Sequence, residues 1–302
     1  MSPAAIFGPA LHRRFPVAVL ALTLPVVLPG QPPERVLCER GFLRIVSPDA
    51  PEMSPDQCRA VANETMNAWR FDAAQKRWPD PGRFETAPLT LELLSVGRMK
   101  SEHPGLYGFA RGRDLMVVSL AVLDRPFAKG TLAHEIAHIQ AKRAMGRQSE
   151  KRLVPGYFIE GHGNGLGRAY RENLRIADHA YDAHMAARIV KMTPAQASAI
   201  LSGDNSGSAA RKDGDAVEAM GIFFVEYLRV RYRGSGIADV IPRMSRVFEA
   251  VGRGETYESA FERQFGEPVG RVVSEIIDFM RRTESAPARR LKGTLYEQFV
   301  SS

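Results

Sequence analysis

The chain has 302 residues, of which 44% are hydrophobic and 25% are charged, and its formal net charge is +7. This composition is typical of a globular protein with one large or two small domains, and it excludes a chain too polar to bury a core. Lysine and arginine are scattered along the chain and are not interleaved with aromatic residues, so we expect no nucleic-acid partner.

The amino terminus has the features of an export signal. His12, Arg13 and Arg14 precede an apolar run over 15–28. This run is shorter than the roughly 20 apolar residues that span a bilayer, and a short apolar run after basic residues is typical of a signal peptide. We therefore expect residues 1–30 to be a signal peptide or a membrane anchor. The rest of the chain would be periplasmic, secreted or anchored facing outward; a cytoplasmic protein with an apolar first strand is the alternative.

The only two cysteines, Cys38 and Cys58, lie early in the predicted mature chain. In an oxidising compartment they would form a disulfide that stabilises the fold by about 3 kcal/mol. Two buried free thiols are the alternative. Because neither cysteine belongs to a C-x-x-C pair, we expect no zinc site made of cysteines.

Short apolar runs in the first half of the chain predict strands over 42–46, 89–94 and 115–123. The glycines between 105 and 112 predict a loop or an irregular hairpin before the last of these strands. A small sheet is therefore expected in this half.

Helices are predicted on both sides of these strands. Ser54, Pro55 and Gln57 form a helix start, with a capping residue, a proline in the first turn and a capping-box glutamine. A helical pattern runs over 129–145 and stops at a glycine. The apolar spacing of the second half predicts helices around 217–228, 237–251 and 269–280, the second of them kinked or begun by Pro242.

The helix over 129–145 carries the motif His134-Glu135-Ile136-Ala137-His138. Residues four apart on a helix project from one face, so His134 and His138 can direct two imidazole nitrogens at one metal ion. Glu135 is rotated by about 100° from His134, which favours proton transfer from a metal-bound water over direct ligation. The spacing thus predicts two zinc ligands and a general base, against the alternative of two ordinary histidines.

A catalytic zinc site needs a third protein ligand and an open fourth position. A metzincin would have a histidine six residues after His138, where this chain has Ala144. Glu160 is the better candidate, because the intervening residues leave room for a turn near Gly146 and a second helix returning beside the first. His162 is the alternative, either as the ligand or as a group that polarises the substrate carbonyl.

These motifs resemble those of gluzincin metallopeptidases, in particular bacterial families with a peptidase-MA-like domain. In those families a Leu-x-His-Glu-x-x-His helix is followed by Pro-x-aromatic-aliphatic-x-Glu-Gly, and 132–138 and 155–161 match the two patterns. The resemblance implies that one zinc ion is held by His134, His138 and Glu160, with Glu135 as general base.

The likeness extends less specifically to other segments. The segment 115–123 resembles the edge strand along which such enzymes bind an extended substrate, and 219–233 and 257–280 resemble their helical second half. The chain departs from the family after Glu160, where glycines alternate over 161–167. Each glycine inside a helix costs about 1 kcal/mol relative to alanine, so we expect this helix to be frayed or to start late.

Gluzincins often stabilise the oxyanion of the reaction with a tyrosine or a histidine. Several tyrosines are candidates, and the sequence does not favour one of them: Tyr157, Tyr170, Tyr227 and Tyr232.

Together these patterns predict an α+β, zincin-like fold, with a small mixed sheet and the zinc helix followed by a mostly helical half. We expect a catalytic domain over 31–282, composed of a mixed half over 31–146 and a helical half over 147–282, and a flexible tail over 283–302. The expected function is zinc-dependent hydrolysis of a peptide or protein substrate. The alternative is a catalytically inactive zinc-bearing module for binding or envelope assembly. No pattern assigns an oligomeric state, and an inhibitory role for residues 31–85 is a further alternative.

Overall fold

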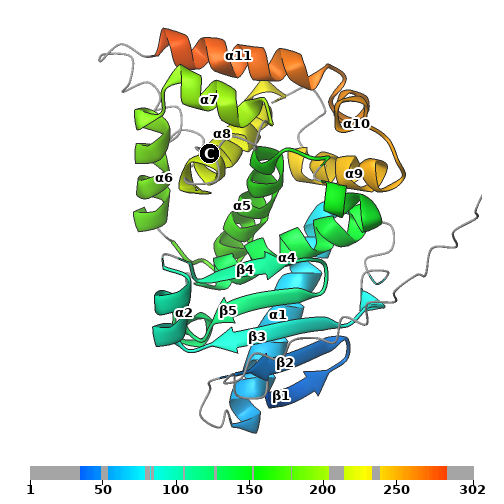
Figure 1. Ribbon diagram of the computed structural model, residues 1–302, viewed down its shortest axis with the longest axis vertical. Coiled ribbons are helices and arrows are strands. Elements are labelled where there is room, and N and C mark those ends of the chain that lie inside the picture. Colours follow the sequence, from blue (N-terminus) through cyan, green and yellow to red (C-terminus); the bar gives the residue numbers. More distant parts are fainter. Residues whose placement is uncertain are drawn as a thin grey trace, which may run out of the picture. The chain divides into compact units, whose positions relative to one another are not determined.

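Figure 1 shows a computed structural model of the chain. It describes residues 35–283, with gaps at 49–53, 79–81, 83–84, 105, 126–127, 152, 178, 204–213 and 233–238. The predicted export segment and the predicted tail beyond Thr283 lie outside the described residues. Among the described helices, none is both long enough and apolar enough to cross a lipid bilayer.

Five strands form one mixed sheet in the order β1-β2-β3-β5-β4. Strands β2, β3 and β5 are parallel, whereas β1 and β4 each pair antiparallel with their inner neighbour. The strands are β1 (Arg35–Arg40), β2 (Leu43–Ser47), β3 (Leu89–Leu94), β4 (Gly108–Arg111) and β5 (Leu115–Ser119). The prediction of an α+β fold with a small mixed sheet is therefore confirmed.

The prediction of an edge strand over 115–123 is wrong in both length and place. β5 ends at Ser119, because the chain then turns into the short helix α3 (Ala121–Asp124). β5 also lies between β3 and β4, so both of its sides are paired. Among the described strands the unpaired edge next to it belongs to β4, which forms from the glycine-containing segment and makes a hairpin with β5.

Helices cover one face of the sheet, and a short helix lies against part of the other face (Figure 1). Met116 and Val118 on β5 point into a core shared with α1 (Pro55–Lys76) and α4 (Ala128–Met145). Val117, on the other face, packs near α2 (Val96–Glu102), as the alternation of side chains along a strand requires. The predicted capping box of α1 is present, since the Gln57 N–H donates to Ser54 Oγ at 3.2 Å and the Ser54 N–H donates to Gln57 Oε1 at 2.9 Å.

The second half of the chain is helical and has its own core. Its helices are α5 (Gly156–Asn173), α6 (His179–Lys191), α7 (Pro194–Leu201), α8 (Gly214–Arg231), α9 (Val240–Gly252), α10 (Tyr257–Phe265) and α11 (Val269–Arg282). Phe158 on α5 packs edge to face against Phe224 and Phe248, so aromatic contacts join α5 to α8 and α9 in this core. Pro242 lies in the first turn of α9, where a missing N–H is tolerated, so it begins that helix and does not kink it.

Helix α5 is unbroken through its alternating glycines, so the prediction that it would be frayed or start late is wrong. Gly163 and Gly167 face α4, whereas Gly161 and Gly165 face α8 and α9 on the opposite side. A Cβ at Gly161 would overlap the carbonyl oxygen of Gly221 on α8. The low helix propensity of these glycines, about 1 kcal/mol each, is offset by a close packing of helices that side chains would prevent.

Gly161→Ala is expected to destabilise the fold by about 1–3 kcal/mol or more, because the added methyl group overlaps the backbone of α8. Gly270→Ala on α11 is the matched control, since no described atom of another element lies within 4 Å of its Cβ position. Alanine there should be neutral or stabilise by up to about 1 kcal/mol. Urea unfolding followed by circular dichroism measures both effects. Equal effects of the two substitutions would contradict this account of the glycines.

Cys38 on β1 and Cys58 on α1 form a disulfide, with their Cα atoms 6.4 Å apart. The bond ties an edge strand to the helix beneath the sheet. It confirms the predicted pairing and is consistent with an exported protein.

Replacing both cysteines by alanine is expected to lower the free energy of unfolding. The disulfide closes a loop with a sequence separation of 20. Its loss costs about 3 kcal/mol in the chain-entropy model. Cys58 is also buried, so unfolding of the wild type with and without dithiothreitol separates the cross-link from the lost packing. Unchanged stability on reduction would show that the bond does not constrain the unfolded chain.

Candidate metal centre

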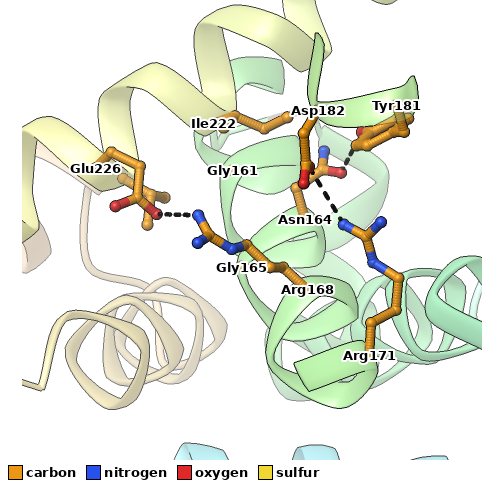
Figure 2. Close-up of a pocket in the computed structure, with 10 residues that line it drawn as sticks. Gly161, Asn164, Gly165, Arg168, Arg171, Tyr181, Asp182, Ile222 and Glu226 are labelled. Carbon is orange, nitrogen blue, oxygen red and sulfur yellow. Dashed lines mark hydrogen bonds and ion pairs between the residues drawn. The ribbon is translucent and has the colours of Figure 1, made fainter. Parts of the chain in front are cut away.

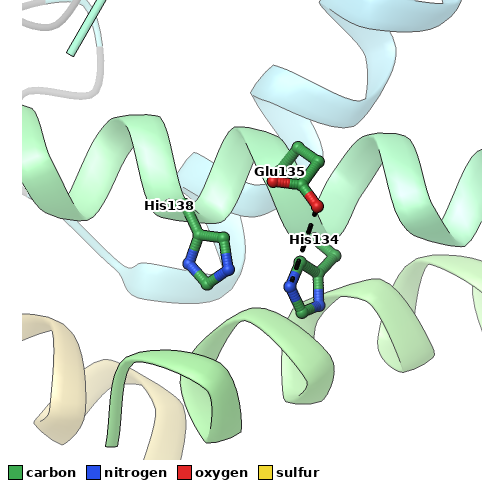
Figure 3. A group of neighbouring side chains, drawn as sticks. All are labelled: His134, Glu135 and His138. Carbon is green, nitrogen blue, oxygen red and sulfur yellow. Dashed lines mark ion pairs between the residues drawn. The ribbon is translucent and has the colours of Figure 1, made fainter. Parts of the chain in front are cut away.

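The candidate centre begins on α4, which presents His134 and His138 one turn apart. On the other side of the helix, Leu132, Ala133 and Ile136 are buried in the core shared with α1 and the sheet. The two imidazole rings lie edge to face with centroids 4.4 Å apart. Their side chains are 12% and 8% exposed. The helix predicted here is confirmed, and it places both rings on one face (Figure 3).

Helix α5 brings a carboxylate to the same point. Glu160 Oε2 lies 3.3 Å from His134 Nε2 and 3.4 Å from His138 Nε2. Two ligand atoms bound about 2.0–2.1 Å from a tetrahedral zinc ion lie about 3.3–3.4 Å apart, so both measured separations fit such a site. The Glu160 side chain is 32% exposed, which leaves the group accessible to solvent on that side.

Glycines allow α5 to approach α4 closely enough for this convergence. A Cβ at Gly163 would lie 3.0 Å from Cε1 of His138 and 3.2 Å from Cε1 of His134. A Cβ at Gly167 would lie 2.7 Å from the carbonyl oxygen of Gly130 on α4. A larger residue at Gly167 would push the two helices apart and carry the carboxylate away from the imidazoles, and one at Gly163 would displace the imidazole rings themselves.

His134, His138 and Glu160 form a triad of candidate ligands. Glu135 lies beside the two imidazoles of this triad (Figure 3). Its Oε1 is 4.0 Å from His134 Nε2, and its side chain is 8% exposed. The ligand atoms of His134, Glu135 and His138 lie within 4.8 Å of one another, so this group could hold a metal ion. Glu160 lies closer to both imidazoles than Glu135 does. The Glu135 carboxylate therefore lies next to the position that His134, His138 and Glu160 surround, and outside it.

The carboxylates near His134 and His138 favour a positive charge at this point. Burial lowers the pKa of His134, but the hydrogen bond to Glu160 and the charges of Glu135, Glu160 and Glu218 outweigh it and raise the pKa to about 10. Burial raises the pKa of Glu160, but the charges and hydrogen bonds of the two histidines hold it far below its ordinary value. Without a metal the group therefore retains a proton on an imidazole, and a divalent cation would supply that charge instead.

His162, the alternative third ligand, lies on another side of α5. Its buried ring packs against Phe248, with Nε2 3.0 Å from Ser245 Oγ. The Ser245 hydroxyl donates to the Ile241 carbonyl at 2.9 Å, so its oxygen accepts from His162. Burial, with the charges of Lys76 and the two metal-site histidines, holds the pKa of His162 well below its usual value. The structure therefore places a neutral His162 in the helical core and away from the triad.

The four tyrosines considered for oxyanion stabilisation have hydroxyls held by other partners. The Tyr157 hydroxyl pairs with that of Tyr257 at 3.2 Å, and the Tyr170 hydroxyl donates to Glu64 at 2.8 Å. The Tyr227 hydroxyl donates to Glu275 at 2.8 Å, and that of Tyr232 donates to Glu267. In this arrangement each of the four hydroxyls is therefore engaged by another side chain.

A pocket beside Glu160 contains a tyrosine that the sequence patterns do not single out (Figure 2). Asn164 Nδ2 donates to the Glu160 carbonyl at 3.0 Å, and Asn164 Oδ1 accepts from the Tyr181 hydroxyl at 2.7 Å. The same hydroxyl lies 2.5 Å from Glu218 Oε1, so Tyr181 on α6 links α5 to α8. Paired charges line the rest of the pocket: Arg171 with Asp182 at 3.5 Å and Arg168 with Glu226 at 3.8 Å.

A buried charged pair lies on the other side of α4. Asp72 and Lys76, one turn apart on α1, are both fully buried. Lys76 Nζ donates to Gln140 Oε1 on α4, whereas the Asp72 carboxylate has no hydrogen-bond partner among the described residues. Burial raises the pKa of Asp72 to about 7, against the charges of Lys76 and His134, and lowers the pKa of Lys76 to about 7, against the charge of Asp72. Asp72 is thus coupled electrostatically to the candidate metal centre through the charge of His134.

These observations define a class of site: two imidazoles four residues apart on one helix, with carboxylates from two helices beside them, in a group that could hold a metal ion. Comparison of the chain with protein-family models, with curated proteins and with solved structures found no match. No relative therefore assigns a metal, a substrate or a reaction, and the function has to follow from the chemistry of the site itself.

The buried Asp72 predicts a pH dependence of stability. Folding raises its pKa from 3.8 to about 7. The stabilisation that the protonated carboxyl gives is therefore full below about pH 4 and is lost as the pH rises through about 7. Asp72→Asn should remove this fall, which amounts to at most about 1.4 kcal/mol per pH unit. Urea unfolding at several pH values tests it, with Asp278→Asn on the exposed side of α11 as control; an unchanged profile in Asp72→Asn would contradict the raised pKa.

Proposed function

We propose that the chain is an exported zinc metallopeptidase that hydrolyses peptide bonds. The observation that carries the proposal is the position of one Glu160 oxygen, 3.3 and 3.4 Å from the Nε2 atoms of His134 and His138, beside the carboxylate of Glu135. Two imidazoles and one carboxylate are a donor set of catalytic zinc in peptidases. The order of these residues along the chain supports the same reading, since it resembles that of the gluzincins.

His134, His138 and Glu160 would hold the ion. Two nitrogens and one oxygen suit zinc, whereas calcium and magnesium prefer ligand sets made of oxygen alone. Three protein ligands leave one tetrahedral position open, and the partial exposure of Glu160 keeps that side accessible. When bound, zinc lowers the pKa of water and polarises the substrate carbonyl.

Glu135 would act as the general base. Its carboxylate lies 4.0 Å from His134 Nε2 in a nearly buried position, outside the triad but next to it. From there it would take a proton from the attacking water and pass it to the leaving amine. Gly108 on β4 lies next to this side chain, since a Cβ there would be in van der Waals contact with Glu135 Cγ at 3.4 Å.

The free edge of β4 would align the substrate. β4 is the outermost strand on this side of the sheet, and Gly108 places it beside Glu135. An extended peptide would add to this edge as a further strand, with main-chain hydrogen bonds that do not depend on its sequence. This arrangement favours a peptide or protein substrate over a small molecule.

The disulfide supports a place outside the cytoplasm, and residues 1–30 would direct export or remain as an anchor. The glycines after Glu160 are the sequence feature that favours a non-catalytic binding or assembly module. Because the close packing of α5 accounts for these glycines, the alternative loses the observation that favours it.

Metal content tests the three ligands. The full-length chain supplied with zinc should contain about one ion per molecule, as a single tripod of ligands requires. His134→Ala and Glu160→Gln should lose this ion in plasma mass spectrometry. Glu172→Gln, an exposed change on the same helix as Glu160, is the control and should keep it. Zinc retained by Glu160→Gln would exclude Glu160 as a ligand.

Hydrolysis tests the base. Glu135→Gln should keep the zinc but cleave a mixed peptide digest about 10²–10⁴-fold more slowly than the wild type, since only proton transfer is removed. Mass spectrometry of the new termini gives the rates. Normal cleavage by a zinc-loaded Glu135→Gln chain would refute the role of Glu135, and no cleavage by the zinc-loaded wild type would refute the peptidase function.

A further inference from the structure

Lys142 lies on the same face of α4 as Glu135, two turns further along the helix. Its Nζ donates a hydrogen bond to the Ala110 carbonyl of β4 at 3.0 Å. An ammonium group has three N–H donors, and this bond uses one of them. Among the described residues no carboxylate lies within ion-pair distance of Lys142, so the other donors are available to a ligand.

The Ala110 carbonyl belongs to the free edge of the sheet. The carbonyl of Tyr107, just before β4, accepts a hydrogen bond from the Ser119 N–H of β5 at 2.8 Å. In an antiparallel pair the backbone groups of successive residues alternate between facing the partner and facing away, so Gly108 and Ala110 face outward. Lys142 therefore stands at one end of the edge that a peptide would occupy.

The charges along this edge change sign. The carboxylates of Glu135 and Glu160 lie at the metal-site end, and Lys142 lies at the other. Burial lowers the pKa of Lys142, and the charges of the same two glutamates oppose that shift, so the ammonium and the carboxylates act on one another. A substrate with a negative group at the Lys142 end matches this arrangement.

The helix geometry gives the distance at which that group would lie. From Glu135 to Lys142 the helix rises by about 10 Å, at about 1.5 Å per residue. An extended chain covers the same distance in about three residues.

We propose that Lys142 binds a carboxylate of the substrate about three residues from the cleaved bond, so that the enzyme prefers peptides with an acidic side chain or a free carboxyl terminus at that place. The inference rests on the function proposed above and assigns its substrate class. An acidic side chain and a free carboxyl terminus offer the same chemical group, a carboxylate that accepts charge-assisted hydrogen bonds from an ammonium.

Cleavage of a proteome-derived peptide library by the zinc-supplied full-length chain tests the inference. The peptides are synthesised, half with free and half with amidated carboxyl termini and all with free acidic side chains, and mass spectrometry identifies the cuts. An acidic side chain as the recognised group gives an enrichment of aspartate or glutamate about three residues from the cut in both halves. A terminal carboxylate gives cuts near the chain end in the unamidated half alone.

Lys142→Gln retains a donor for the Ala110 carbonyl but removes the charge. It should slow cleavage of the preferred peptides about tenfold or more, with neutral peptides changed less than about twofold. Lys142→Arg should retain the preference, and Lys191→Gln on the exposed side of α6 is the control. A preference unchanged in Lys142→Gln, or absent from the wild type, would overturn the inference and leave the proposed function intact.

Binding separates the inference from the reaction. In the Glu135→Gln background, fluorescence anisotropy compares labelled glutamate-containing peptides with matched glutamine-containing ones. The glutamate-containing peptides should bind more tightly, and a second change of Lys142→Gln should abolish that difference, about tenfold in Kd. If the wild type cleaves nothing but this Lys142-dependent difference is observed, the peptidase function fails and the carboxylate site stands; if neither is observed, both fail.

Discussion

The close approach of α5 to its neighbours is the constraint on which the rest of the structure depends. Four of its glycines form two pairs spaced four residues apart, Gly161 with Gly165 and Gly163 with Gly167, and the pairs lie on opposite sides of the helix. One side meets α4 and the other meets α8 and α9. At Gly167 the backbone of α4, and at Gly161 the backbone of α8, leaves no space for a Cβ. The position of Glu160 follows from this contact. A carboxylate on α5 can lie within 3.4 Å of two imidazoles on α4 only if the axes of these two helices are close together.

Helix α4 differs from an ordinary amphipathic helix because polar groups lie on two of its sides. One side carries the imidazoles and Glu135, and another carries Gln140, which accepts from the buried Lys76. Buried charges of this kind are tolerated only when each has a compensating charge. On the side of α4 that faces α1, the positive charge of Lys76 compensates the negative charge of Asp72. On the side of the imidazoles, the carboxylates of Glu135 and Glu160 favour a cation. The two clusters together explain why so short a segment holds so many buried polar side chains.

The parts of the structure that depend on local spacing could be predicted from the sequence. The imidazoles of α4, the capping box at Ser54 and the pairing of Cys38 with Cys58 are of this kind. The frayed helix after Glu160 was a wrong prediction because propensity describes an isolated helix, whereas tertiary packing decides α5. The spacing of its glycines was the available signal, since residues four apart share a face.

Features that depend on long-range contacts were missed. The edge position of β4 follows from strand order, which no local pattern gives. Tyr181 reaches the pocket only through the docking of α6, and its sequence signal is limited to a shared face with Met185 and Ile189. The residues of the candidate metal centre come from two helices that each contact both cores. α4 packs Leu132 into the core beside the sheet and Ala137 into the helical core, and α5 packs Phe158 into the helical core and Tyr170 beside the sheet. An ion held between them would cross-link the two helices to which both cores are attached. Metal loading would then raise the free energy of unfolding of both cores together, because the ion binds only where the two helices are docked.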